Sequence, residues 1–140
     1  MTKVTIELTK EQAGTLMQAC ELFARIKMGQ FDEIIHTMHM DTYDKSLNRP
    51  EFDQDMAKAY LNQARNVIFS DIGSSAYIGI SHTSESSKMA WDIYQQLRHD
   101  LCVYTNPKPA DPMIAWDRAY DTPYALSKQP LPKIVITEGE

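Results

Sequence analysis

The chain has 140 residues, 43% of them hydrophobic and 24% charged, which is the length and composition of one ordinary globular domain. Its net charge of −5 argues against general nucleic-acid binding, because neutralising phosphates requires a basic surface. No apolar run approaches the roughly 20 residues that span a bilayer, and no signal peptide is expected. The two cysteines, Cys20 and Cys102, are expected to be reduced, which indicates a cytoplasmic location.

The first predicted elements are a strand and a helix that contains a glycine. Residues 3–8 alternate between apolar and polar side chains, which is the period of a half-buried strand. Thr9 and Gln12 then have the spacing of a capping box, and apolar residues recur at helical spacing beyond it. Gly29 interrupts this pattern, so the sequence predicts either one bent helix or two helices.

Two more helices are predicted in the middle of the chain. Asn48 and Pro50 resemble a helix start, and the third helix is expected to end near Phe69. Its apolar stripe consists of Phe52, Met56, Tyr60, Ala64 and Val67. A brief extended segment is expected around residues 77–80. The fourth helix is strongly amphipathic, and its core-facing stripe consists of Ala90, Ile93, Tyr94, Leu97, Leu101 and Tyr104.

The last part of the chain predicts a loop and a short strand. Six of the seven prolines fall between Pro107 and Pro132, so a long proline-rich loop is expected over residues 105–132. Residues 134–136 form a compact apolar strand pattern. The predicted fold is α+β and predominantly helical, a single domain over residues 1–140. Three to four helices would pack on a small sheet that the N- and C-terminal strands form. A two-stranded ribbon is marginal alone, so self-association into a homo-oligomer is expected.

Three polar groups have the composition of a catalytic or metal site, and each also has a structural explanation. His36 and His39, with Asp41 and Asp44 just downstream, form the first group. The two histidines are spaced to share a metal ion on one helix face, but no third ligand has a fixed spacing. His82 begins the short element of two-histidine phosphoesterases, which need two copies of it. The acidic residues near predicted helix starts, which also complement the macrodipole, are Asp32, Glu33, Asp53 and Asp55. We therefore predict no metal, no cofactor and no enzyme, with a metal-dependent or two-histidine phosphoesterase left as an alternative.

A fourth group combines aromatic, arginine and amide side chains. Aromatic faces stack on bases, and arginines hold phosphates through paired hydrogen bonds. The candidate ligand-binding residues are Arg98, Trp91, Tyr77 and Gln95 around the fourth helix, Arg25 and Gln30 near Gly29, and Arg118 and Trp116 in the proline-rich loop. The same residue types also serve protein interfaces and ordinary packing, so a ligand pocket, an interaction surface and a packed core remain alternatives.

Two segments carry a resemblance to known proteins. LFARIKMGQFDEI (Leu22–Ile34) and YIGISHTSESSKMAWDIYQQLRHDL (Tyr77–Leu101) resemble segments of small open reading frames from tailed phages and prophages. Some proteins of this size in such genomes are similar to sponges of the anti-Thoeris or anti-CBASS type, which trap cyclic nucleotide or cyclic ADP-ribose immune signals between subunits. The resemblance implies an accessory protein of the host cytoplasm that sequesters a nucleotide-derived immune signal without cleaving it. The alternative partner is a host defence protein that the chain binds and inhibits directly, for which an acidic surface would suit a basic target.

Overall fold

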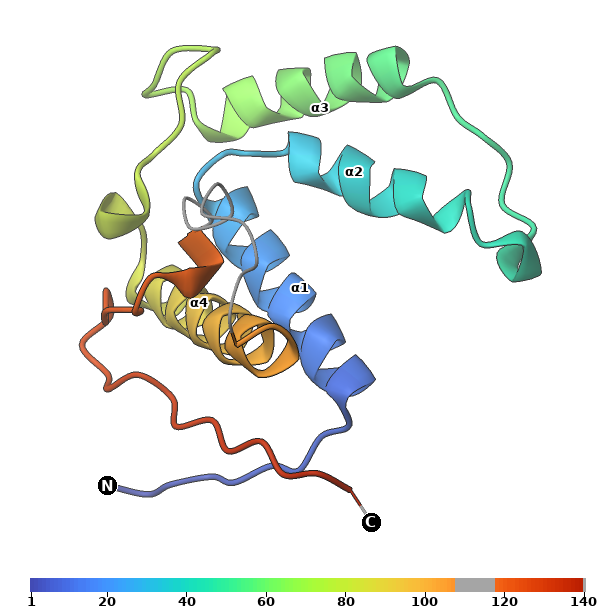
Figure 1. The fold of residues 1–140 in the computed structure, drawn as a ribbon. Coiled ribbons are helices and arrows are strands. Elements are labelled where there is room, and N and C mark those ends of the chain that lie inside the picture. Colours follow the sequence, from blue (N-terminus) through green and yellow to red (C-terminus); the bar gives the residue numbers. More distant parts are fainter. Residues whose placement is uncertain (108–117, 140) are drawn as a thin grey trace. The chain divides into compact units, whose positions relative to one another are not determined.

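The computed structural model describes residues 1–107 and 118–139, with only the backbone at residue 118 (Figure 1). The described residues form four α-helices: α1 (Lys10–Lys27), α2 (Asp32–Asp41), α3 (Gln54–Ile68) and α4 (Glu85–Thr105). They also form three short 3-10 helices: η1 (Lys45–Leu47), η2 (Ile80–His82) and η4 (Arg118–Tyr120). The expectation of a predominantly helical fold is therefore confirmed.

The predicted terminal sheet is wrong, because the described residues contain no strand. Val4 and Val135 are 90% and 69% exposed, so the alternating apolar pattern of these segments is not buried against a helical layer. A two-stranded ribbon gains too little from its own hydrogen bonds to persist without such a layer. The segment around residues 77–80 also forms no strand, and it leads into η2.

Contacts divide the chain into two compact units, each of which is described by itself. The first unit comprises Met1–Glu21 and Glu85–Glu140, and the second comprises Leu22–Ser84. The boundary falls within α1, whose start belongs to the first unit and whose end belongs to the second. The prediction of a single domain over residues 1–140 stays a prediction.

The start of α1 carries the capping box that the sequence predicts. The backbone N–H of Thr9 donates to Oε1 of Gln12 at 2.9 Å, and the backbone N–H of Gln12 donates to Oγ1 of Thr9 at 3.2 Å. The two bonds satisfy backbone donors that the first turn of a helix leaves free. This prediction is confirmed.

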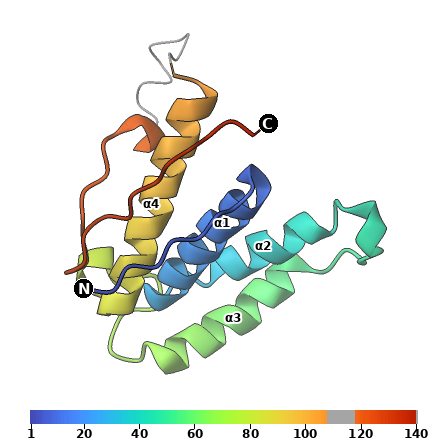
Figure 2. The ribbon, with the colours of Figure 1, turned by 90° about the horizontal axis from the view of Figure 1, so that it is seen from below.

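In the first unit, α4 holds residues 124–127, which belong to the predicted proline-rich loop. The Asp92 side chain is 2% exposed, and its carboxylate accepts hydrogen bonds from the backbone N–H of Leu126 at 2.9 Å and of Ser127 at 3.0 Å. The Ser127 hydroxyl donates a further bond of 2.7 Å. Gln95 donates from Nε2 to the Tyr124 carbonyl at 2.7 Å. This segment runs beside α4 in both ribbon views because polar side chains of the helix hold its backbone (Figures 1 and 2).

On the other face of α4, the predicted apolar stripe is buried in the middle of the helix. Ala90, Tyr94 and Leu97 are buried, whereas Tyr104 at the helix end is 46% exposed. α4 therefore buries residues on two sides, the Asp92 carboxylate on one and the apolar stripe on the other.

In the second unit, the helical pattern is interrupted at Gly29, between the end of α1 and the start of α2. Gly29 has a φ of +86°, a backbone conformation that glycine adopts without steric cost, so two helices form instead of one bent helix. α2 and α3 then lie side by side (Figures 1 and 2). Phe31, which is 8% exposed, meets Phe69 edge to face with ring centroids 6.0 Å apart.

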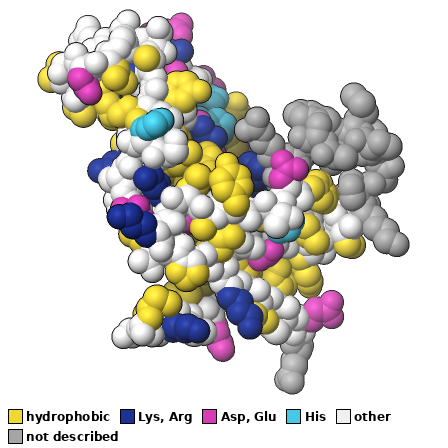
Figure 3. Space-filling model, turned by 90° about the vertical axis from the view of Figure 1, so that its left-hand side faces the viewer, with side chains coloured by type: hydrophobic (Ala, Val, Ile, Leu, Met, Phe, Trp, Pro, Cys, Tyr) yellow, Lys and Arg dark blue, Asp and Glu magenta, His cyan; other side chains and the backbone are white. Residues whose placement is uncertain are grey.

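The apolar stripe that predicts α3 is largely exposed. Met56, Tyr60 and Val67 are 56%, 66% and 79% exposed, whereas Arg65 is 3% exposed. Hydrophobic side chains also reach the surface on the face of the molecule that Figure 3 draws. The buried side chain of α3 is therefore a cation, Arg65, and most apolar residues of this helix are exposed.

The predicted start of the third helix is also wrong. α3 begins at Gln54, and the Asp53 side chain caps it by accepting a bond from the backbone N–H of Met56 at 3.0 Å. Asn48 instead ends η1 with a φ of +47°. Asparagine tolerates this left-handed conformation better than most residues, so it suits a turn as well as a helix start.

Candidate functional site

A pocket of about 550 Å³ lies within the second unit, and we call it the Arg65 pocket. Its walls are residues 29–33 at the start of α2, one face of α3, and residues 74–77. On α3, the lining residues Lys58, Asn62 and Arg65 recur at i, i+4 and i+7, which places them on the same side of the helix. The volume falls in the range of small-molecule sites, about 300–1,000 Å³.

Arg65 is the most unusual side chain of this pocket. Its Nη1 donates to the Gly73 carbonyl at 2.9 Å and to Oδ1 of Asn66 at 3.1 Å. Its guanidinium also lies over the Phe69 ring, 5.8 Å from the centroid. Its Nη2 is buried and has no hydrogen-bond partner among the described residues. Since a guanidinium stays protonated, a positive charge is buried here against neutral partners alone.

The backbone at Gly29 passes close to this guanidinium. A Cβ at Gly29 would lie 3.5 Å from Nε of Arg65 and 3.6 Å from the Phe69 ring. Those separations are ordinary contacts, so the requirement for glycine comes from its φ of +86° and not from a lack of space.

The third wall of the pocket is a turn anchored at both ends. The Gly73 carbonyl accepts from Arg65 and from the backbone N–H of Ala76 at 3.0 Å. The backbone N–H of Ile78 donates to the Met28 carbonyl at 2.9 Å. Residues 74–77 between these anchors are exposed. Tyr77, which is 62% exposed, therefore presents an aromatic ring at the rim of the pocket.

The acidic residues of the pocket already have cationic partners. Asp32 lies 3.4 Å from Nζ of Lys58, and Glu33 lies 3.8 Å from Nε of Arg25. Arg25 also donates from Nη1 to Oε1 of Gln30 at 2.7 Å. The ion pairs leave Arg65 as the pocket's cation without a carboxylate partner in the part of the chain that the structure describes.

Three of the residues that the sequence singles out come together here. Gln30 and Tyr77 line the pocket, and Arg25 bonds to Gln30. The sequence reasoning missed Arg65 itself. A signal was present, because Arg65 stands between Leu61 and Phe69 at i, i+4 and i+8, where an amphipathic helix ordinarily has an apolar residue.

The remaining candidate residues lie elsewhere. Arg98 donates to the Tyr94 hydroxyl at 2.9 Å and lies over the Tyr94 ring, 5.4 Å from its centroid. The Trp91 ring packs against the same tyrosine with centroids 5.0 Å apart. With Gln95, which bonds to Asp92 at 3.2 Å, these residues belong to the first unit. Trp116 lies outside the described residues, and so does the side chain of Arg118.

The histidine group has local structural partners. His39 bonds to the Tyr43 hydroxyl at 3.0 Å, and Nε2 of Gln54 lies 3.1 Å from its Nδ1. Asp44 accepts from the hydroxyl and the backbone N–H of Ser46, and these bonds hold the pKa of its carboxyl below the usual value. In the described ranges, no group of three or more His, Cys, Asp or Glu side chains is placed to hold a metal ion.

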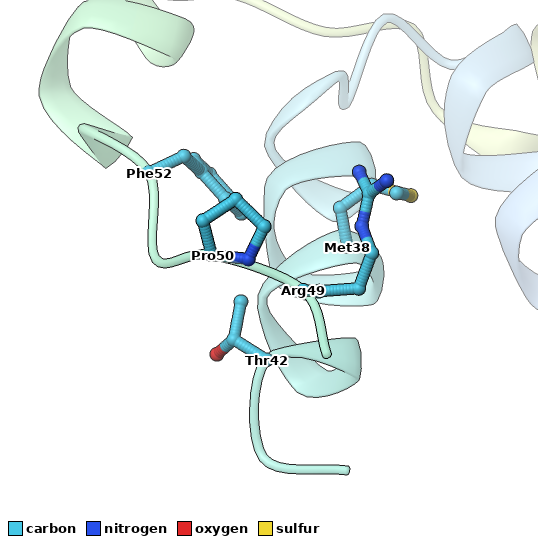
Figure 4. Close-up of a pocket in the computed structure, with 5 residues that line it drawn as sticks. All are labelled: Met38, Thr42, Arg49, Pro50 and Phe52. Carbon is cyan, nitrogen blue, oxygen red and sulfur yellow. The ribbon is translucent and has the colours of Figure 1, made fainter. Parts of the chain in front are cut away.

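A smaller pocket of about 280 Å³ lies at the other end of α2. Figure 4 shows Met38 on α2, Thr42 directly after the helix end, and Arg49, Pro50 and Phe52 on the segment that leads to α3. Arg49 is exposed to solvent, which screens its charge. The Arg65 pocket is the stronger candidate because its cation is buried.

Comparisons with protein-family models, with curated proteins and with solved structures found no match. Over residues 1–107 and 118–139, no helix combines the length and the apolar character needed to cross a membrane.

Proposed function

We propose that this protein binds a small, nucleotide-derived anion in the Arg65 pocket and holds it without cleaving it. The observation that supports the proposal is the buried guanidinium of Arg65, whose Nη2 lacks a hydrogen-bond partner among the described residues. Burying an unpaired charge is costly, and an anion that accepts a charge-assisted hydrogen bond offsets that cost.

Neutral groups around the pocket suit the rest of a nucleotide. The Tyr77 ring at the rim offers a face on which a base stacks. The Asn62 amide has a donor and an acceptor, which base edges require, and Gln30 has its NH2 donor, since its Oε1 accepts from Arg25. Because Asp32 and Glu33 are already paired with cations, neither is an unpaired carboxylate suited to activating a water molecule. In a phage-type accessory protein, the ligand would be a cyclic nucleotide or a cyclic ADP-ribose signal.

The test is calorimetric titration with a panel of cyclic mononucleotides, cyclic dinucleotides and cyclic ADP-ribose isomers, followed by heat denaturation and chromatography of the released compound. We expect at least one compound to bind and to return intact. Arg65→Met should abolish that binding, whereas Arg49→Met, which removes an exposed cation of the same unit, should not. An altered compound would indicate an enzyme, and a panel without a binder would contradict the proposal.

The exposed apolar stripe of α3 favours a second candidate function, direct inhibition of a host defence protein. Met56, Tyr60 and Val67 are all more than half exposed, and exposed apolar patches often mark protein interfaces. In cells carrying a defence system that the chain inhibits, Tyr60→Asp should then abolish inhibition while Arg65→Met leaves it intact. The opposite pattern would contradict this candidate and favour ligand binding.

A further inference from the structure

We propose that the ligand of the Arg65 pocket carries a single negative charge at the group that Arg65 binds, as a phosphodiester does, and not the two charges of a phosphomonoester. This inference rests on the proposed function and specifies its ligand class. It follows from the pairing and the depth of the charges around the pocket.

The pocket is lined by two acidic and two basic side chains: Asp32, Glu33, Lys58 and Arg65. Lys58 pairs with Asp32 at 3.4 Å, and Glu33 pairs at 3.8 Å with Arg25, which does not line the pocket. Each of these two pairs is neutral. The charge that remains is the single positive charge of Arg65, so one negative charge on the ligand completes the balance.

The burial of these charged groups differs, and Arg65 should contribute most of the electrostatic attraction for an anion. The Lys58 and Asp32 side chains are 54% and 58% exposed, so water and salt screen that pair. Arg65 is 3% exposed, where interactions between charges are stronger. A second negative charge at the same depth would have no buried cation beside it among the described residues. Its desolvation would then oppose binding.

The hydrogen bonds of Arg65 also favour a ligand group with one negative charge. Nη1 is occupied by the Gly73 carbonyl and Asn66, which leaves Nη2 as the amino group available to a ligand. Nη2 is covered from solvent, so a ligand that bonds to it has to displace part of that cover. Residues 74–77 are an exposed part of the pocket lining, and bonds at Gly73 and Ile78 hold them at both ends.

Matched ligands test the charge directly. Adenosine, 3′,5′-cyclic AMP and 5′-AMP share a base and carry zero, one and, at pH 8, two negative charges, since the second phosphate pKa is about 6. Dimethyl phosphate and methyl phosphate make the same comparison without a base. We expect cyclic AMP to bind at least about tenfold more tightly than adenosine and more tightly than 5′-AMP. In NMR titrations, dimethyl phosphate should shift the Arg65 Nε–H signal more than methyl phosphate does.

The outcomes separate the two proposals. Equal binding of adenosine and cyclic AMP, or tighter binding of 5′-AMP, overturns the single-charge inference while leaving nucleotide binding intact. A response to dimethyl phosphate without binding of any nucleotide supports the single-charge inference and contradicts the nucleotide function. No response to any of the five compounds overturns both. Arg65→Lys provides a folded variant if Arg65→Met is unstable, and it should lose most of the cyclic AMP affinity, because lysine lacks the planar fork.

Neutralising the charge of Asp32 supplies a second, independent readout. Asp32→Asn releases Lys58 from its partner and gives the pocket a second free cation. We expect 5′-AMP and methyl phosphate to bind only a few-fold more tightly to this variant, because Lys58 is exposed and solvent screens its charge. Asp41→Asn is the control, since it makes the same change in net charge at an exposed position outside the pocket. Equal gains in the two variants would contradict the assigned pairing.

Discussion

At the scale of single residues, two glycines of this chain should respond to alanine in opposite directions. Gly29→Ala forces a side chain into a φ of +86° and should destabilise the fold by about 1 kcal/mol or more. Gly14→Ala lies inside α1 with no atom within 4 Å of the new Cβ, and it should stabilise the fold by about 0.5–1 kcal/mol. Urea unfolding of both variants measures the difference, and two changes of the same sign would contradict the conformation assigned to Gly29.

Asp92 is a second residue whose replacement should have a large effect. Asp92→Ala leaves the backbone N–H groups of Leu126 and Ser127 without their acceptor in a part-buried site. An unsatisfied buried donor costs about 1–3 kcal/mol, so we expect a loss of at least about 2 kcal/mol in the free energy of unfolding. Asp121→Ala, in an exposed part of the same segment, should change it by less than about 0.5 kcal/mol. Similar losses in the two variants would show that the carboxylate does not hold this segment.

At the scale of elements, the start of α3 depends on one capping side chain. Asp53→Ala removes the acceptor for the Met56 backbone N–H and should cost about 0.5–2 kcal/mol. Asp55→Ala keeps that cap and removes only a favourable charge in the first turn, which contributes about 0.3–1 kcal/mol. Thermal unfolding followed by circular dichroism compares them. A larger loss for Asp55→Ala would place the cap elsewhere.

The elements also show what can be predicted from sequence here and what cannot. Thr9 and Gln12 act within four residues of each other, so the capping box is readable from spacing alone. The helix break at Gly29 and the buried centre of α4 are likewise consequences of local pattern. Whether residues 3–8 pair with another strand depends on a distant partner, and spacing within the segment carries no information about it.

The candidate site illustrates the same limit. Arg25, Gln30 and Tyr77 were recognised by residue type, but α4 supplied most of the other candidates because its aromatic and basic residues are concentrated there. Arg65 has one sequence signal, its place between Leu61 and Phe69 at helical spacing, and its burial and hydrogen bonds are what make it a candidate. Because an arginine in an amphipathic helix is usually exposed, that spacing alone is a weak reason to select it.

At the scale of the whole molecule, the C-terminal residues should be dispensable for folding. Val135 is 69% exposed, Ile134 and Ile136 are only partly buried, and residues 134–139 make no strand pairing. Deleting residues 134–140 should therefore shift the melting temperature by only a few degrees, since surface changes are usually within about 0.5 kcal/mol. A molten or aggregated truncation would mean that these residues belong to the core after all.

The predicted self-association also belongs to this scale, and it stays a prediction. Light scattering at micromolar concentration measures it, and a mass of 16.0 kDa would indicate a monomer. The Arg65 pocket lies within one unit of one chain, so the proposed ligand binding does not depend on the outcome.

The central claim is that a buried, unpaired guanidinium makes this protein a binder of small nucleotide-derived anions. Its most direct test is calorimetric titration of the cyclic nucleotide panel into the intact protein and into Arg65→Met, with circular dichroism confirming that both are folded. Our account predicts saturable binding to the intact protein, recovery of the ligand unchanged, and no binding to folded Arg65→Met. Equal affinity in the two folded proteins, or no binding to either, would contradict it.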